Sequence, residues 1–548
     1  MATPVGQAAV DEHALSVRER RCVLFVHGIG EQRKSETLLW MGSPLVDWVL
    51  KWSRAFYGPG RAAVGRVELS FTPFDQGMLD KPPIAILNLP DQQWYLGEAW
   101  WAGSNYHPDF ATMLSWSLAH LGDILAQLIR AAFERARYLF APKPNSSAPG
   151  WLWRAIDLLN CIGLCVLYAL GAVIGYPLIV LLMILSQIPI EAVQDFVLFR
   201  LLQPFLSASV GDFKLFLDDE LQAANVRRRV ADAARDLLDR VGCRDLVVVA
   251  HSEGAVASLG VLTDPEFRPL ADSVKLITLG AGLNKSWLVR PDLDRIFAPV
   301  TDRIAWTDIW ASYDPVPAGP LDPSPRQGVT IADIFRPGGV PSTPVSEQVT
   351  NGMEVLTDHG AYFDNDEQVL LRLAAEISAP DHRQSVFWPR GSGPDPEAFL
   401  HQWVRKRRVR VSALALWRDI AVAAWLALAV VAWLPVPGWL TGVDPWAPLE
   451  QVAPTAPLVG GFVAGLRGLH AFLSGLPALF APVAAAVGAV LQVPAGLGLA
   501  ALAGLLCLLV YRLVVWAAWS RWDARERAAF VDALAAYSRQ RLRLPAAA

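Results

Sequence analysis

The chain is short of charged residues. Asp, Glu, Lys and Arg make up only 18% of its 548 residues, against roughly 25% in typical soluble domains, whereas 53% are hydrophobic. The net charge of −4 lacks the basic excess that marks nucleic-acid binding, so we expect no nucleic-acid partner. The 40 Gly and 40 Pro residues are scattered without a period, which excludes a collagen-like protein. This composition favours a membrane protein.

Cysteine is also scarce. Five cysteines are too few and too scattered for a disulfide framework. Cys161 and Cys165 lie in an apolar run without a His or acidic residue at metal-ligand spacing, so packing explains them and no metal site is predicted. The first 21 residues carry charges where a signal peptide needs an apolar core, so we expect that the first domain is not exported.

The hydrophobic residues gather in three uncharged runs, whose bounds are 158–190, 420–443 and 468–511. A membrane-spanning helix needs about 20 apolar residues. We therefore predict an α-helical transmembrane region over 401–548, with spans at about 413–435 and 493–516. Residues 457–492 between the spans are predicted to be interfacial or re-entrant.

Basic residues flank both predicted spans. Residues 405–410 (RKRRVR) precede the first span. Four arginines lie at the end of the second span and after it: Arg512, Arg521, Arg525 and Arg527. By the positive-inside rule both flanks face the cytoplasm. With the missing signal peptide and the Ala- and Arg-rich composition, this predicts a bacterial inner-membrane protein with a cytoplasmic catalytic domain. The many Ala and Gly residues in the spans would also permit oligomers through helix packing.

The rest of the sequence alternates between strand and helix patterns. Short apolar, β-rich runs occupy 21–26, 66–71, 245–250, 275–279 and 303–310. Such alternation predicts an α/β fold with a mostly parallel, doubly wound sheet. We place the two parts of this domain at 1–75 and 223–400. A helical insertion at 76–222, with a membrane-associated hairpin at about 151–190, separates them.

One short segment carries the clearest chemical pattern. In residues 250–255 (AHSEGA), an apolar strand runs into Ser252, with a small residue two positions before it and Gly254 two positions after it. Small side chains at these positions allow a sharp turn that pushes the serine hydroxyl to the edge of the sheet. The pattern resembles the nucleophile elbow of the α/β-hydrolase superfamily, with Ala250 where the family usually has glycine. The alternative is a serine that merely caps a helix.

A second segment strengthens the resemblance to lipase- and esterase-like serine hydrolases. His27-Gly28-Ile29-Gly30 follows the first predicted strand, where the resembled family carries an oxyanion loop. The resemblance implies that the backbone N–H groups of Ile29 or Gly30 and of Glu253 hold the oxyanion. His27, Gly28, His251 and Gly254 would support the two motifs. An ordinary glycine turn is the alternative, and the Glu253 side chain is expected to point outward at the helix N-terminus.

The resemblance also implies a base and an acid, which follow the serine in this family as acid and then histidine. Asp314 lies in a loop just after the strand at 303–310 and is our acid, with Asp308 as the alternative. His359 lies in a polar loop with a tyrosine three residues later and is our base, favoured over His382. His401 and His470 are less suitable, because they lie next to or beyond the predicted membrane region.

If both motifs belong to one sheet, residues 158–190 must cross the membrane an even number of times. Two full crossings need about 40 residues with the turn, so we expect a shallow embedded hairpin; the alternative is a soluble hairpin packed on the domain. The sequence thus predicts a membrane-embedded serine hydrolase that cleaves a carboxylic ester or thioester of a membrane lipid or acylated substrate, without metal or cofactor. The competing hypothesis is a catalytically silent domain that serves as a membrane-tethered interaction module.

Overall fold

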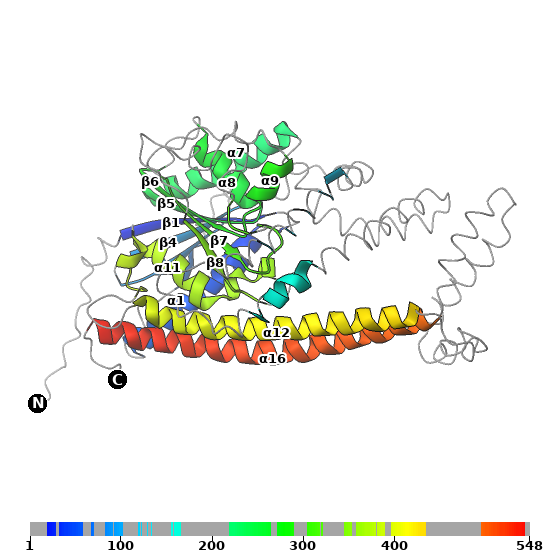
Figure 1. The fold of residues 1–548 in the computed structure, drawn as a ribbon. Helices are drawn as coiled ribbons and strands as arrows, with labels where there is room; N and C mark the ends of the chain where they lie inside the picture. Colours follow the sequence, from blue (N-terminus) through cyan, green and yellow to red (C-terminus); the bar gives the residue numbers. More distant parts are fainter. Residues whose placement is uncertain are drawn as a thin grey trace, which may run out of the picture. The chain divides into compact units, whose positions relative to one another are not determined.

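The computed structural model describes an α/β core and two long helices (Figure 1). The chain divides into two compact units, Met1–Ser412 with Arg525–Ala548, and Ala413–Ala524. The structure describes residues 19–28, 32–58, 67–70, 83–90, 92–101, some of 119–133, most of 155–165, 219–264, 271–289, 304–317, 319–321, 345–352, 358–379, 381–388, 396–433 and 495–542.

Strands and helices alternate along the first unit. The strands are β1 (Glu19–Val26), β2 (Val67–Ser70), β3 (Ile84–Asn88), β4 (Gln92–Ala99), β5 (Asp245–His251), β6 (Ser273–Leu279), β7 (Ile304–Ala311) and β8 (Val345–Val349). The helices are α1 (Ser43–Tyr57), α7 (Glu220–Val241), α8 (Gly254–Thr263), α9 (Leu283–Val289), α11 (Leu371–Ser378), α12 (Pro396–Trp433) and α16 (Ala495–Arg541). Short helical turns are η2 (Leu38–Gly42), η9 (Asp358–Gly360), η10 (Tyr362–Asp364), η11 (Asp366–Leu370) and η12 (His382–Gln384).

The described strands form one eight-stranded sheet in the order β2-β3-β4-β1-β5-β6-β7-β8. Every neighbouring pair from β4 to β8 in this order is parallel, whereas β3 runs antiparallel to both of its neighbours. The α/β class and the mostly parallel sheet therefore agree with the sequence-based expectation. The carboxyl ends of β1, β5, β6 and β7 share one edge of the sheet, and the loops at this edge carry the residues of interest.

Helices cover both faces of the sheet (Figure 1). Cys22, Leu24 and Val26 of β1 face a core shared with α7 and α8. Val23 and Phe25 face the opposite core, which α1, α11 and the buried residues of α16 complete. This alternation along β1 follows from the two-residue period of a strand. Both faces being buried, the central strands are almost entirely apolar.

Two strands lie in the region 76–222, for which the sequence predicted a helical insertion. β3 and β4 lie within residues 76–222, yet they pair with the sheet. The sequence of β4 does not look like that of a buried strand, because it contains a charged residue, Glu98. This residue is nevertheless only 1% exposed. The Glu98 carboxylate accepts hydrogen bonds from the backbone N–H groups of Ser35 and Leu38. A charged residue with such partners is tolerated in a core, but it breaks the apolar run that identifies a buried strand.

Cys22 of β1 and Cys243, which follows α7, form a disulfide with their Cα atoms 6.2 Å apart. The sequence separation of 221 residues gave no hint of this pair. Helix α7 ends immediately before Cys243, and both ends of this helix are capped. Asp219 accepts hydrogen bonds from two N–H groups of the first turn, and Gly242 ends the helix in the left-handed conformation with φ +71°.

The prediction of a transmembrane region was wrong. Within the part of the chain that the structure describes, no helix is both long and apolar enough to cross a membrane. The predicted spans at 413–435 and 493–516 fall largely on α12 and α16. Each predicted span includes charged residues: Arg418 and Asp419, which pair at 2.6 Å, lie in the first, and Arg512 lies in the second.

Other parts of the membrane prediction fall elsewhere. The predicted hairpin at 151–190 lies outside the described residues except for most of 155–165, which are helical. Residues 457–492 also lie outside them. In the first unit, the beginning of α12 and the end of α16 pack together on the sheet domain: Trp403 meets Phe530 edge-on, with ring centroids 5.6 Å apart. Phe530 is fully buried in the core on the α1 and α11 face.

Candidate active site

Ser252 occupies a strained turn between β5 and α8. Its φ of +58° lies in the left-handed region, where only one other non-glycine residue of the described chain is found. Such a backbone conformation costs of order 1–3 kcal/mol and persists only when its surroundings impose it. Here the Ser252 N–H donates to Leu279 O of β6 at 3.0 Å, and the Gly282 N–H donates to Ser252 O at 3.3 Å. The strand, the turn and the helix together present Ser252 at the carboxyl edge of the sheet.

Two glycines permit the close approach of chain segments at this turn. A Cβ atom added to Gly28 would lie against the Ser252 side chain, 2.9 Å from its Oγ, and 3.1 Å from His251 O. A Cβ atom added to Gly254 would lie 2.6 Å from Val26 O. Real Cβ atoms essentially never come within 3.0 Å of another heavy atom in this way. The loop after β1 is therefore in direct contact with Ser252, as the sequence-based hypothesis of one shared site requires.

His27 fixes the start of that loop. Its ring stacks on Trp101 with centroids 4.6 Å apart. Nδ1 bonds to Gly28 O at 2.6 Å, so this nitrogen carries the proton, and Nε2 can accept the Trp101 N–H at 3.4 Å. Burial lowers the pKa of His27 to about 4, which keeps the ring neutral. The predicted oxyanion donors Ile29 and Gly30 lie outside the described residues.

Glu253, the other predicted oxyanion donor, follows Ser252 at the start of α8. The backbone N–H groups of a first helical turn have no partner within their own helix, so this position suits a donor to an anion. The side chain does not point outward as expected: Glu253 is 2% exposed, and its Oε1 has no hydrogen-bond partner among the described residues. Burial raises the pKa of Glu253 well above its usual value and so favours the neutral form of the side chain.

Asp314 and His359 are brought into direct contact. Asp314 follows β7, and His359 lies in the histidine loop, which we define as residues 358–367. His359 Nδ1 lies 2.9 Å from Asp314 Oδ2. Since a carboxylate only accepts, Nδ1 donates, which leaves Nε2 as the nitrogen free to take a proton. This is the arrangement that a base for a serine hydroxyl needs.

The carboxylate of Asp314 is buried but well satisfied. Oδ2 also accepts the hydroxyl of Tyr362 at 2.7 Å, and Oδ1 accepts the Val316 N–H at 2.8 Å. Burial alone would raise the pKa of Asp314, but the charge of His359 and these hydrogen bonds outweigh it and hold the pKa below its ordinary value. Asp314 is therefore ionised at neutral pH and can stabilise a positive charge that develops on His359.

The alternative acid and base occupy other positions. Asp308 lies within β7, and its two oxygens accept the hydroxyls of Thr278 at 2.7 Å and Ser346 at 3.0 Å. Burial raises the pKa of Asp308 to about 6, although both hydrogen bonds oppose the shift. His382 begins η12, and its side chain is outside the described residues. Of the predicted acids, Asp314 is thus the one that meets His359.

His251 does more than support the serine motif. Its Nε2 lies 2.8 Å from His359 O, so the ring donates to the backbone of the candidate base. The two imidazole rings are in contact, with centroids 4.4 Å apart. Burial, followed by the nearby His359, lowers the pKa of His251 to about 3. The neutral ring keeps one N–H for this bond at any physiological pH.

Two residues beside the candidate base were not assigned a role from sequence. Tyr362 holds Asp314 through its hydroxyl and accepts the Ala311 N–H at 2.9 Å. Asp358 is fully buried, and its carboxylate accepts the N–H groups of Tyr313 at 2.9 Å and Gly352 at 2.6 Å. A role for Tyr362 could have been predicted from its position three residues after His359. Asp358 lacked such a pattern, because its contacts with Tyr313 and Gly352 form only in the folded chain.

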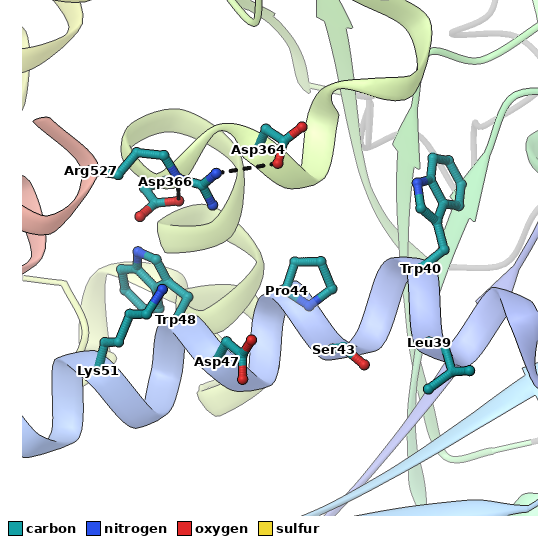
Figure 2. A pocket seen from close by; sticks show the side chains of 10 residues that line it. All are labelled: Leu39, Trp40, Ser43, Pro44, Asp47, Trp48, Lys51, Asp364, Asp366 and Arg527. Atoms are coloured by element: carbon teal, nitrogen blue, oxygen red, sulfur yellow. Dashed lines mark hydrogen bonds and ion pairs between the residues drawn. The ribbon is translucent and has the colours of Figure 1, made fainter. Parts of the chain in front are cut away.

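A pocket of about 350 Å³ lies beside the histidine loop (Figure 2). Tryptophans and charged side chains line it together; the lining residues are Leu39, Trp40, Ser43, Pro44, Asp47, Trp48, Lys51, Asp364, Asp366 and Arg527. Trp40 joins the pocket to the serine motif, because its ring meets His251 edge-on with centroids 4.9 Å apart. The volume of the pocket lies in the range of about 300–1,000 Å³ that is typical of small-ligand sites.

Neither a metal centre nor a known relative accounts for this arrangement. In the described ranges of the chain, no group of three or more His, Cys, Asp or Glu side chains is placed to hold a metal ion. Comparisons with protein-family models, with curated proteins and with solved structures found no match. The geometry of the site itself is therefore what supports a function.

Proposed function

We propose that this protein is a serine hydrolase that cleaves a carboxylic ester or thioester of a lipid or acylated substrate. Ser252 is the nucleophile, His359 the general base and Asp314 the residue that orients His359. The observation that carries the proposal is the bond from His359 Nδ1 to Asp314 Oδ2 at 2.9 Å. His359 also contacts the ring of His251, the residue before Ser252, which is held at φ +58°. Structural aspartate–histidine pairs are common, but a strained serine turn at the same sheet edge is not.

In the first half-reaction Ser252 Oγ attacks the carbonyl carbon, and its proton passes to His359 Nε2. The carbonyl oxygen becomes an oxyanion, for which the N–H of Glu253, at the start of α8, is the donor that we propose among the described residues. Each such donor typically contributes about 3–4 kcal/mol to the transition state. His359 then gives the proton to the departing alcohol or thiol, and the acyl group remains bonded to Ser252.

The second half-reaction reverses these roles with water. His359 Nε2 takes a proton from the attacking water, whose oxygen bonds to the acyl carbon. The bond to Ser252 Oγ breaks, the proton returns to that oxygen, and a carboxylic acid leaves. Asp314 stays ionised in both steps and stabilises the imidazolium form of His359. Apart from the attacking water, the groups that act in these steps belong to the chain.

The pocket in Figure 2 is suited to a part of the substrate that does not react. Trp40 borders both the pocket and His251, so the pocket lies one side chain away from the serine motif. Leu39 and Trp40 are 65% and 38% exposed, which leaves apolar surface for an acyl chain or similar group. Binding energy from such a remote contact can be used at the reacting carbon.

The test is labelling of the purified protein with a fluorophosphonate, which bonds covalently to an activated serine. We expect the wild type to be labelled at Ser252, and Ser252→Ala and His359→Ala to lose labelling by at least about 10³-fold. Ser258→Ala is the matched control, since Ser258 is a buried serine of α8 outside the site. Labelling that survives in Ser252→Ala would contradict the proposal, as would a folded wild type that never labels and hydrolyses no ester; a silent interaction module would then be favoured.

A further inference from the structure

The two long helices make specific contacts with the histidine loop. Both α12 and α16 carry one arginine each whose guanidinium reaches that loop or its flank. We propose that Arg407 of α12 and Arg527 of α16 are positioning residues that hold His359 in its working place. This inference rests on the proposed function and adds that the helices take part in the catalytic arrangement.

Arg407 is buried against the chain that leads into the histidine loop. It is 2% exposed. Its guanidinium donates to Thr350 O at 2.8 Å and to Asn351 O at 2.8 Å. A third bond, at 3.0 Å, joins it to the Glu367 carboxylate at the other end of the loop. One side chain of α12 therefore bridges the chain before the loop and the residue that ends it.

A single residue connects these contacts to the candidate base. Asn351 accepts from Arg407 through its carbonyl, and its side-chain amide donates to Asp358 O at 3.2 Å. Asp358 immediately precedes His359, and its carboxylate accepts the N–H groups of Gly352 and Tyr313. Tyr313 is the neighbour of the candidate acid. The carboxylate of Asp358 therefore joins the backbone next to His359 to the backbone next to Asp314.

Arg527, on the other helix, holds the second half of the histidine loop. Its Nε lies 2.7 Å from Asp366 Oδ1, and its Nη1 lies 3.2 Å from Asp364 Oδ1. Figure 2 shows the guanidinium reaching both carboxylates above the pocket. Asp366 is 4% exposed at its side chain, whereas Asp364 is 65% exposed. The buried ion pair with Asp366 fixes the chain seven residues beyond His359.

Physical chemistry explains why such contacts indicate positioning and not simple cohesion. Removing a guanidinium and a carboxylate from water is costly, and their attraction often does no more than offset that cost. What a buried, fully bonded arginine supplies is a fixed geometry, since its planar donors must meet several acceptors at once. Catalysis is sensitive to that geometry, because a displacement of about 1 Å can slow a reaction about 100-fold.

The decisive experiment compares arginine variants of the full chain by the second-order rate of fluorophosphonate labelling at Ser252. We expect Arg407→Met to lower this rate by about 10- to 100-fold. Arg407→Lys should restore little, because an ammonium cannot satisfy two carbonyls and a carboxylate in one plane. Arg527→Met, which is less buried, should lower the rate by about 3- to 10-fold. Arg410→Met is the matched control, since Arg410 pairs loosely with Glu526 at 3.7 Å.

A second measurement separates positioning from folding and from the proposed chemistry. Amide hydrogen exchange should become faster in residues 350–367 of Arg407→Met and Arg527→Met, while the exchange of β5 and β6 stays as in the wild type. Arg527→Met keeps the test valid if Arg407→Met does not fold, since its contact is partly exposed. If the wild type itself is never labelled, the proposed chemistry fails, and the exchange data alone decide whether the arginines hold the loop. Labelling rates and loop exchange that match the wild type in a folded Arg527→Met and Arg407→Lys would overturn the inference.

Discussion

The turn that carries Ser252 and the loop that carries His359 are held by different kinds of contact. Around Ser252 the restraints come from the main chain: hydrogen bonds to the neighbouring strand and the close approach of Gly28 and Gly254. Around His359 they come from side chains, with Asp314, Asp358 and the arginines of the two long helices as the principal ones.

This difference has a physical consequence. A site held by backbone packing tolerates no added volume, because glycine is the only residue that fits such an approach. A site held by polar side chains tolerates added volume but depends on each hydrogen-bonding group, since a buried group left without its partner costs about 1–3 kcal/mol. The predictions below test whether the two parts of the site respond in these opposite ways.

The largest effect is expected for Asp314→Asn. Both oxygens of the Asp314 carboxylate accept hydrogen bonds, whereas an amide has one accepting oxygen and one donating nitrogen. An uncharged amide also cannot stabilise an imidazolium as a carboxylate does. The rate of fluorophosphonate labelling should therefore fall by about 10³- to 10⁴-fold, with the fold retained. Asp308→Asn is the matched control, because Asp308 is also a buried acid of this region but bonds to two hydroxyls. Equal losses in both variants would show that burial of an acid, and not contact with His359, matters.

The same variant sharpens the comparison through pH. The pKa of Asp314 in the fold lies below its ordinary value of 3.8, so its carboxylate stabilises the folded state above that pH. The stabilisation is lost as the pH falls through the folded pKa. The melting temperature of Asp314→Asn should accordingly respond less than that of the wild type to acidification below pH 3.8. An identical pH response of the two proteins would argue against an ionised Asp314.

A smaller effect is expected for Gly28→Ala. The added methyl group meets the Ser252 side chain and the carbonyl of His251, so the serine turn or the loop after β1 must move. We expect labelling to slow by about 100-fold, the usual penalty for a displacement of about 1 Å. Gly360→Ala is the control on the opposite side of the site, since an added Cβ there meets nothing within 4 Å. Its labelling rate should stay at the wild-type level although it neighbours His359.

The smallest effect is expected for Tyr362→Phe. The change removes the donor to Asp314 and leaves the Ala311 N–H without its acceptor, while the aromatic ring keeps its volume. Labelling should slow by about 10-fold, and the folded state should lose about 1–3 kcal/mol. Chemical denaturation measures the second quantity. Tyr95→Phe, which breaks a hydroxyl contact with Gln93 on β4, should leave labelling unchanged.

Much of this arrangement was predictable from local sequence. The apolar run of β5 followed by AHSEGA indicates a strand, a sharp turn and a helix, because the residues that impose the turn are adjacent in the chain. Asp314 followed from chain order and from its place after a strand. The contact between Asp314 and His359 matches that choice, while the roles of these residues stay predictions until labelling is measured.

Other features could not be predicted, for identifiable reasons. The contacts of Arg407 join residues 40 to 57 positions apart, and the basic stretch 405–410 suggested exposure at a membrane surface instead. Arg407 is buried because it finds two carbonyls and a carboxylate in the folded chain. β4 was missed because Glu98 is buried with backbone partners. The membrane spans were predicted from apolar content alone, which long helices with interspersed charges can also show.

The disulfide between Cys22 and Cys243 makes residues 22–243 a closed covalent ring. A protease that cuts this ring once opens it but releases nothing. The nicked protein would run as one chain on a non-reducing gel and as two after reduction. Since β1 and β5 are neighbours in the sheet, the bond also keeps the strand before the HGIG loop attached to the strand before Ser252 when the long connection between them has been cut.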